Sequence, residues 1–244
     1  MIKNISLFFF FILTNYVSNA QTEKNVDHQN LIWTRYYNQL ELNDKWSIHS
    51  EFDNRVFVNP IVQNLFVIRV QGRHKISDQI ELGAGFAYFS VATQDPEKVS
   101  SFDKPEYRGQ QDITWKQNWN KIGIAQRFQI EERFFQHFDE EGLTSGSTFF
   151  WRFRYRIQGD YTFWKKEKQH LKAIVYDELM INAGEKVIYN TFDQNRIYVA
   201  LQYGVNENLS LEMGYMNSFQ QRVSGVDYYD RNIIRFSIFH KLKI

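Results

Sequence analysis

The side chains best able to do chemistry in this sequence are the arginines of WRFRYRIQ, residues 151–158. Arg152, Arg154 and Arg156 alternate there with aromatic residues. Residues two apart on an extended chain point to the same side, so the three guanidinium groups share one face. Rings of arginine inside a pore can select anionic solutes, and buried carboxylates can instead neutralise them. Between these two roles, we expect the ion-pair network.

Catalytic and metal-dependent chemistry has weaker candidates. Ser47 and His49 share a face and could form an acid–base couple, although such a pair usually has no catalytic role. Gly83 and Gly85, in the sequence GAG, resemble part of a phosphate loop, but they lie in an extended segment without the lysine of that motif. None of the histidines forms a metal-spaced pair; they are His28, His49, His74, His137, His170 and His240.

Composition argues against several further classes of protein. The net charge of +1 argues against a nucleic-acid partner, because binding phosphates requires a clear basic excess. Acidic stretches around Asp95, Asp103 and Asp139–Glu141 have the oxygen ligands that calcium prefers, but solvated loops have the same composition. We therefore predict no catalytic residue, no metal and no cofactor, and the sequence favours a protein that is not an enzyme.

The elements that position the arginines are segments with a two-residue period. In residues 121–134, one face carries Ile122, Ile124, Phe128 and Ile130, and the other carries Gly123, Ala125, Arg127, Gln129, Glu131 and Arg133. The same alternation recurs in residues 151–158, 171–182 and 234–242. One face suits lipid and the other suits water, as in a membrane barrel. A soluble antiparallel sheet alternates in the same way, with its apolar face on a core.

The connections between these segments differ in length. Short polar turns lie at 42–46, 76–80, 117–122, 164–169 and 205–209, whereas longer connections cover 93–109, 136–147 and 224–229. Bacterial outer-membrane barrels have this asymmetry, with short periplasmic turns and longer extracellular loops. Tryptophans also lie near both ends of the segments, as in two interfacial girdles. Trp46, Trp115, Trp119 and Trp164 are near the short turns, and Trp33 and Trp151 are far from them.

These patterns predict an all-β fold, an antiparallel up-and-down transmembrane β-barrel. Eleven segments of about 12 residues can be counted, each long enough for a tilted crossing of a bilayer. Since bacterial single-chain barrels have even strand numbers, we expect about 12 strands, with residues 21–30 supplying the additional one, and 10 as the alternative. Residues 1–20 have the basic start, apolar run and small-residue end of a cleaved signal peptide. Residues 21–244 are then a single outer-membrane barrel domain.

Four stretches carry a resemblance to a known family. RFQIEERF, FRYRIQGDY, YDELMIN and FDQNRIYVALQYGVNENLSLEMGYM resemble, in order and spacing, the family catalogued as domain of unknown function 2490. It is a group of predicted outer-membrane β-barrel proteins of Gram-negative bacteria. The resemblance covers roughly residues 31–244 and is more specific in the second half. It implies a barrel in the outer membrane, and no substrate or catalytic residue comes with it.

Folding adjacent segments back on each other predicts which inward charges meet. Glu178 falls opposite Arg196, with Arg154 and Arg156 on its other side. Glu51 falls near Arg69, and Glu131 near Arg152. The predicted lumen-facing network consists of Glu51, Arg69, Arg127, Glu131, Arg133, Arg152, Arg154, Arg156, Glu178 and Arg196.

The sequence thus predicts an outer-membrane β-barrel of the Gram-negative envelope, with a structural or porin-like role and an arginine-rich lumen. Two alternatives stay open, an outer-membrane lipid-modifying enzyme and a soluble secreted β-barrel binding protein. The partners expected are outer-membrane lipids, small anionic solutes and the barrel-assembly machinery.

Overall fold

The alternating segments of the sequence form eleven β-strands in the residues that the structure, a computed structural model, describes: 23–98, 102–139 and 142–244. Their bounds are β1 (Asn25–Glu41), β2 (Trp46–Phe57), β3 (Val62–Lys75), β4 (Ile80–Val91), β5 (Lys104–Trp119), β6 (Ile122–Phe138), β7 (Leu143–Lys166), β8 (Gln169–Ala183), β9 (Phe192–Gly204), β10 (Leu209–Gln221) and β11 (Asp227–Lys243). No helix in these residues is long and apolar enough to cross a membrane. The expected signal peptide, residues 1–20, lies outside them.

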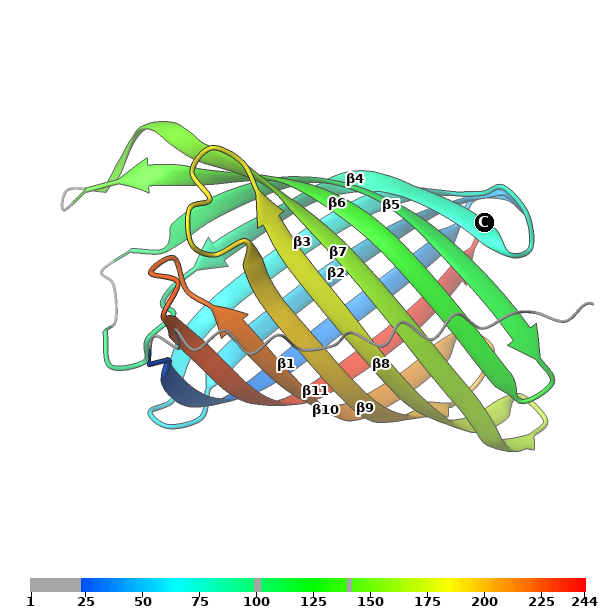
Figure 1. Cartoon of the computed structure of the whole chain (residues 1–244). Coiled ribbons are helices and arrows are strands. Elements are labelled where there is room, and N and C mark those ends of the chain that lie inside the picture. Colours follow the sequence, from blue (N-terminus) through cyan, green and yellow to red (C-terminus); the bar gives the residue numbers. More distant parts are fainter. Residues whose placement is uncertain (1–22, 99–101, 140–141) are drawn as a thin grey trace, which may run out of the picture.

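The eleven strands of the described residues close into one barrel (Figure 1). Consecutive strands pair antiparallel, and β1 pairs with β11 in parallel, from Asn25 beside Asp227 to Glu41 beside Lys243. Our expectation of 12 strands, or 10, in a wholly antiparallel barrel is therefore wrong. An odd number of up-and-down strands leaves the first and last running in the same direction, so they can close only in parallel. The described residues of the expected extra strand begin β1 itself.

The two ends of the barrel differ in their connections. At the end we call the turn end, the strands are joined by two to four residues, at 42–45, 76–79, 120–121, 167–168 and 205–208. At the opposite loop end, the connections span four to twelve residues, and the β6–β7 hairpin extends beyond the other strands (Figure 1). Two connections are shorter than we expected, because β5 already begins at Lys104 and β7 at Leu143.

Polar side chains close the four-residue turns. The Asn43 carboxamide accepts hydrogen bonds from the backbone N–H groups of Lys45 and Trp46, at 3.0 and 2.9 Å. Asn206 accepts in the same way from the two residues that lead into β10, at 2.8 and 2.9 Å. Such side-chain acceptors replace the ladder partners that the reversing backbone loses. The turns therefore fix the register of the hairpins whose inner faces carry the charges.

The two faces of the wall follow the alternation in the sequence. In β7, Arg152 and Arg154 are buried inside the barrel, whereas Trp151, Tyr155 and Ile157 are exposed on the outside. The strand period of two forces this separation. Trp33 was expected in an outer girdle, and that expectation is wrong. Its neighbours Ile32 and Thr34 occupy the outward positions of β1, which leaves the indole 4% exposed in the interior.

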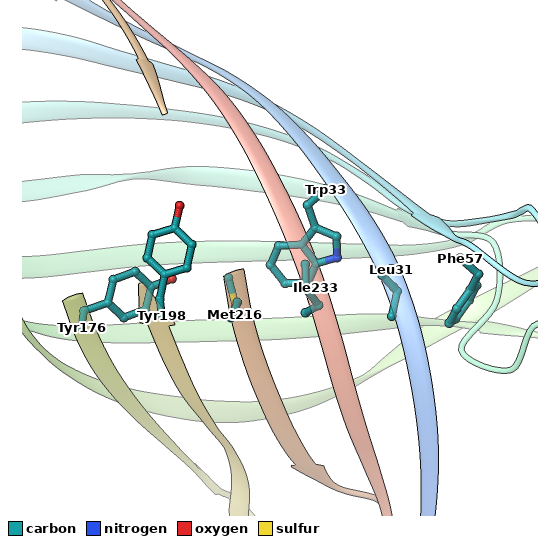
Figure 2. Packing of buried hydrophobic residues seen from close by; sticks show 7 residues of the cluster. All are labelled: Leu31, Trp33, Phe57, Tyr176, Tyr198, Met216 and Ile233. Atoms are coloured by element: carbon teal, nitrogen blue, oxygen red, sulfur yellow. The ribbon is translucent and has the colours of Figure 1, made fainter. Parts of the chain in front are cut away.

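Apolar and aromatic residues cover one part of the interior, which we call the aromatic wall. They come from β8–β11, β1 and β2 and form a row across neighbouring strands (Figure 2). The wall consists of Tyr176, Tyr198, Met216, Ile233, Leu31, Trp33 and Phe57. A smaller cluster of Leu65, Val67, Ala87 and Phe89 lies on β3 and β4. Much of the rest of the interior is polar, and many of its charged groups lie on β5–β8.

Candidate functional site

All ten charged residues of the predicted network point into the barrel. Glu51, Glu131, Arg133, Arg152, Arg154 and Glu178 are buried, and Arg69, Arg127, Arg156 and Arg196 are half-buried. Strand register places Glu51 beside Arg69, Glu131 beside Arg152, and Glu178 between Arg156 and Arg196. Glu51 and Arg69 form an ion pair. The strand pairing thus brings these ten side chains together on one inner surface.

Glu131 is the centre of the most deeply buried group. Its carboxylate is 0% exposed and accepts from three arginines, Arg152 at 2.5 Å, Arg154 at 2.6 Å and Arg108 at 3.2 Å. Arg152 also donates to Asp193 on β9, at 2.9 Å. Charge-assisted bonds of this kind are the strong ones, and a carboxylate can accept several at once. Glu131 therefore joins β5, β6 and β7 by side chains as well as by the backbone ladder.

Glu178 is the centre of a second group, on the side of the aromatic wall. Its Oε1 accepts from Arg127 at 2.7 Å and from Arg154 at 2.8 Å, and its Oε2 lies 3.9 Å from Arg196. Arg154 contacts Glu131 as well and so links the two groups. The Arg127 contact spans two strands, from β6 to β8, and the register of neighbouring strands alone does not reveal it.

Sequence reasoning missed several members of the interior network. Glu106 accepts from Arg108 and Arg133, both at 2.6 Å. The missing signal was available, since Glu106, Arg108, Gln110, Asp112 and Thr114 are polar at every second position. The connection predicted at 93–109 covers the first of these residues, whereas β5 already begins at Lys104. We call the charges of β5–β8 that pair around Glu106, Glu131 and Glu178 the ion-pair wall; they are Glu106, Arg108, Arg127, Glu131, Arg133, Arg152, Arg154 and Glu178.

Two further charged groups lie nearer the turn end and were also missed. Arg73 pairs with Asp112 at 2.9 Å and with Glu81. A Cβ on Gly83 would lie 2.8 Å from the Arg73 guanidinium, and in addition 2.5 Å from Asp112. Gly83 therefore makes room for this ion pair, and the GAG sequence is part of a strand rather than a phosphate loop. Arg235 pairs with Glu212 at 3.2 Å.

Aromatic rings hold the arginines on the other side of the interior. The guanidinium of Arg55 lies 3.8 Å from the centre of the Trp33 ring, and that of Arg196 lies 5.3 Å from it. Arg235 lies 3.9 Å from the ring of Tyr198. Cation–π contacts at this distance are attractive, and more so when water is excluded. A ring covers the flat face of a guanidinium and leaves the donors on its edge free for other partners.

The interior encloses two cavities. A chamber of about 490 Å³ on the loop side is bordered by Phe135, Arg133, Arg222 and Tyr229 among others. A chamber of about 420 Å³ on the turn side is bordered by Tyr37, Arg73, Arg156 and Tyr176 among others. Five side chains border both chambers and so form the layer between them. We call this layer the constriction; it consists of Trp33, Arg55, Arg69, Arg154 and Arg196.

Two inward arginines of the described strands have no carboxylate within ion-pair distance. Arg231, at the loop end, donates to the side-chain oxygens of Gln29, Gln94 and Gln220 at 2.8 to 3.0 Å. Arg156 borders the turn-side chamber and lies over the ring of Tyr176, at 5.3 Å from its centre. These two guanidinium groups therefore have no direct ion-pair partner among the described residues.

The candidate acid–base couple forms a short chain of hydrogen bonds. Ser47 Oγ lies 3.0 Å from His49 Nε2, and His49 Nδ1 contacts the hydroxyl of Tyr37. His49 is buried on the inner face of β2. This couple therefore lies inside the barrel and away from its outer face.

The acidic connections do not assemble a metal site in the part of the chain that the structure describes, where no group of three or more His, Cys, Asp or Glu could hold an ion. Two residues of the acidic stretch, 140–141, lie outside that part. The Asp95 carboxylate accepts from the backbone N–H of Glu97 at 3.0 Å, which lowers the pKa of Asp95. Asp95 is thus ionised and bonded within its own loop, with Lys98 at 3.3 Å.

Comparison with known proteins identifies a family. The model of a family described as protein of unknown function, DUF2490, matches residues 30–229. The chain belongs to this family. No curated protein matches the chain. A solved structure of the NanC porin, in a rhombohedral crystal form, is similar at 12% sequence identity and a TM-score of 0.46, over 80% of this chain and 85% of that one.

Proposed function

We propose that this chain is an outer-membrane β-barrel whose lumen admits small anions. Its location is supported by the outer face of the barrel. Val199, Leu201 and Met213 lie on adjacent strands and are 49%, 57% and 57% exposed. They belong to an apolar surface that continues around the outside of the barrel. Soluble monomers rarely expose an apolar surface of this extent. In a bilayer the same surface contacts lipid, and the inward polar side chains stay in water or pair with each other.

The ends of the barrel support an orientation. Four tryptophans, Trp46, Trp115, Trp119 and Trp164, are exposed near the turn end, where indole rings favour a membrane interface. We propose that this end faces the periplasm and the loop end faces the outside, as in bacterial barrels with short periplasmic turns. The proposal includes export with a cleaved signal peptide, lipids as surrounding partners, and insertion by the barrel-assembly machinery.

The observation that carries the proposed function is the constriction. Four of its five side chains are arginines, and they separate two chambers that lie along one interior. Arg154 pairs with Glu131 and Glu178, and Arg69 pairs with Glu51. Arg55 pairs with Asp53 at 2.7 Å and stacks on Trp33, whereas Arg196 is 3.9 Å from Glu178. A solute that passes between the chambers meets guanidinium groups on several sides, which favours anions and repels cations.

Two measurements test the proposal in sequence. We expect the full chain to fractionate with the outer membrane and to migrate differently on a gel before and after heating, as folded barrels do. A soluble protein whose migration does not change on heating would contradict the membrane location and support the alternative, a soluble secreted β-barrel binding protein. The purified protein should then produce discrete conductance steps in a planar bilayer. A membrane-inserted barrel without conductance would leave only the structural role.

A further inference from the structure

The turn-side chamber contains two arginines that face each other without enough carboxylate between them. Arg127 on β6 and Arg156 on β7 are direct register partners. Like charges directly opposite each other on neighbouring strands destabilise a sheet. Something must therefore offset the repulsion between these two guanidinium groups, and the obvious candidate is Glu178, the register partner of Arg156 on β8.

Glu178 forms no ion pair with Arg156, so it offsets this repulsion only in part. Its Oε1 is already shared by Arg127 and Arg154, at 2.7 and 2.8 Å, and its Oε2 is directed to Arg196, at 3.9 Å. In the described residues, one carboxylate thus stands among four arginines, and Arg154 divides its donors between Glu178 and Glu131. Arg156 contacts neither oxygen. The positive charge around Glu178 exceeds what the protein neutralises.

The Arg156 guanidinium is placed to use its free donors. Its Cζ lies 5.3 Å from the centre of the Tyr176 ring, and it borders the turn-side chamber together with Arg127, Gln158 and Tyr176. Arg127 donates to Glu178 through Nη2, and its side chain is still 20% exposed. Planar guanidinium groups bind carboxylates and phosphates through pairs of parallel hydrogen bonds. Two such groups side by side at the turn-side chamber have the chemistry of an oxyanion site.

We propose that Arg156 and Arg127 bind one small oxyanion, a carboxylate or a phosphate, in the turn-side chamber. The anion supplies the counter-charge that Glu178 does not provide and lies between the two arginines on the chamber side. This site deepens the proposed function, on which it rests for its role in solute passage. It does not require conduction, because it is defined by the equilibrium charge balance of the folded barrel.

The test is calorimetric titration of the full chain, folded in detergent micelles, with inorganic phosphate and separately with acetate at constant ionic strength. We expect saturable binding of one equivalent per chain with at least one of them, and the stronger of the two identifies the preferred oxyanion. Arg156→Gln removes one bidentate donor and should weaken binding about tenfold or more. Arg156→Lys, which keeps the charge but not the planar fork, should give an intermediate affinity.

Arg231→Gln is the matched control. It makes the same chemical change at the other arginine without a carboxylate, in the loop-side chamber, and should leave the affinity as in the wild type. Each variant must keep the heat-dependent gel migration of the folded barrel. Absence of saturable binding to the wild type, or equal affinity in wild type and Arg156→Gln, would overturn the site. Binding without conductance would overturn the proposed pore and leave the site standing.

Discussion

The ion-pair wall and the aromatic wall line the same interior but hold their arginines by different means. In the ion-pair wall, carboxylates neutralise the guanidinium groups, as Glu131 does for Arg152 and Arg154 at 2.5 and 2.6 Å. Beside the aromatic wall, rings support them as well, as Tyr198 does for Arg235 at 3.9 Å, in addition to the ion pair of Arg235 with Glu212. A carboxylate neutralises the charge of an arginine and accepts hydrogen bonds from its N–H groups. A ring covers only the flat face of the guanidinium and accepts none of its in-plane hydrogen bonds.

This difference separates structural from available arginines. Arginines that share Glu131 join β5, β6 and β7 and have little left to offer a solute. Arg156 contacts the aromatic wall through Tyr176 and keeps its donors. Arg55 and Arg196, stacked on Trp33, are intermediate, since each also has a carboxylate within 4.0 Å. The count of inward arginines therefore overstates the number that can attract an anion. The partner of each arginine determines whether it is available.

The largest effect is expected in the ion-pair wall. Glu178→Ala leaves Arg127, Arg154 and Arg196 without their shared carboxylate in a buried site. Removing one partner of a buried ion pair costs about 3 to 5 kcal/mol. We expect a decrease of this size in the free energy of unfolding, measured by urea titration of the protein in lipid vesicles.

The neighbouring carboxylate provides the control for that variant. Asp177 faces the outside of β8 and accepts a single hydrogen bond from Asn195, at 2.5 Å. Asp177→Ala should cost no more than about 1 kcal/mol. If the two alanine variants were equally stable, the ion pairs of Glu178 would contribute no more to stability than one hydrogen bond on the outer face. The ion-pair wall would then not hold the strands together.

The second largest effect is expected on the outer face of the barrel, opposite the two inner walls. Ile238 is 43% exposed on the outside of β11. Ile238→Arg places a cation in hydrocarbon if that face contacts lipid, at a cost of about 2 to 4 kcal/mol. Gln158→Arg, on the inner face at the turn-side chamber, should be mild by comparison. Equal urea midpoints for the two variants in vesicles would contradict the assignment of the faces.

The smallest effect is expected in the aromatic wall. Tyr198→Phe keeps the ring beneath Arg235 and removes the hydroxyl that donates to Glu212 at 2.7 Å. Glu212 retains Arg235 as a partner, at 3.2 Å, so we expect a loss of about 1 kcal/mol. Tyr215→Phe, whose hydroxyl donates to Asn232 on the outer face at 2.6 Å, is the control. A loss at Tyr198 comparable with that of Glu178→Ala would show that the hydroxyl, rather than the ring, stabilises this wall.

The sequence predicted the parts of the structure that depend on local geometry. The alternation in residues 151–158 assigned each side chain to a face, and folding at the short turns placed Glu178 opposite Arg196, because both follow from the two-residue period and antiparallel register. The burial of Trp33 was missed. The position of Trp33 depends on which face of β1 points into the barrel. The flanking residues Ile32 and Thr34, one apolar and one polar, do not indicate that face.

What could not be predicted depends on contacts between distant strands. The parallel pairing of β1 with β11 joins residues about 200 positions apart, and no local pattern records it, so the strand number was wrong. The contact of Arg127 with Glu178 spans two strands, and it arises from the length of the arginine side chain and the curvature of the closed wall. The constriction has the same origin, since it combines side chains from β1, β2, β3, β7 and β9.

The central claim is that unneutralised arginines make the lumen selective for anions, and the zero-current potential of the wild-type barrel tests it most directly. The protein is inserted in a planar bilayer of neutral lipid between two potassium chloride solutions that differ tenfold in concentration. We predict a potential of the sign that a chloride permeability greater than the potassium permeability produces. A potential of the opposite sign, with potassium the more permeant ion, would contradict the account.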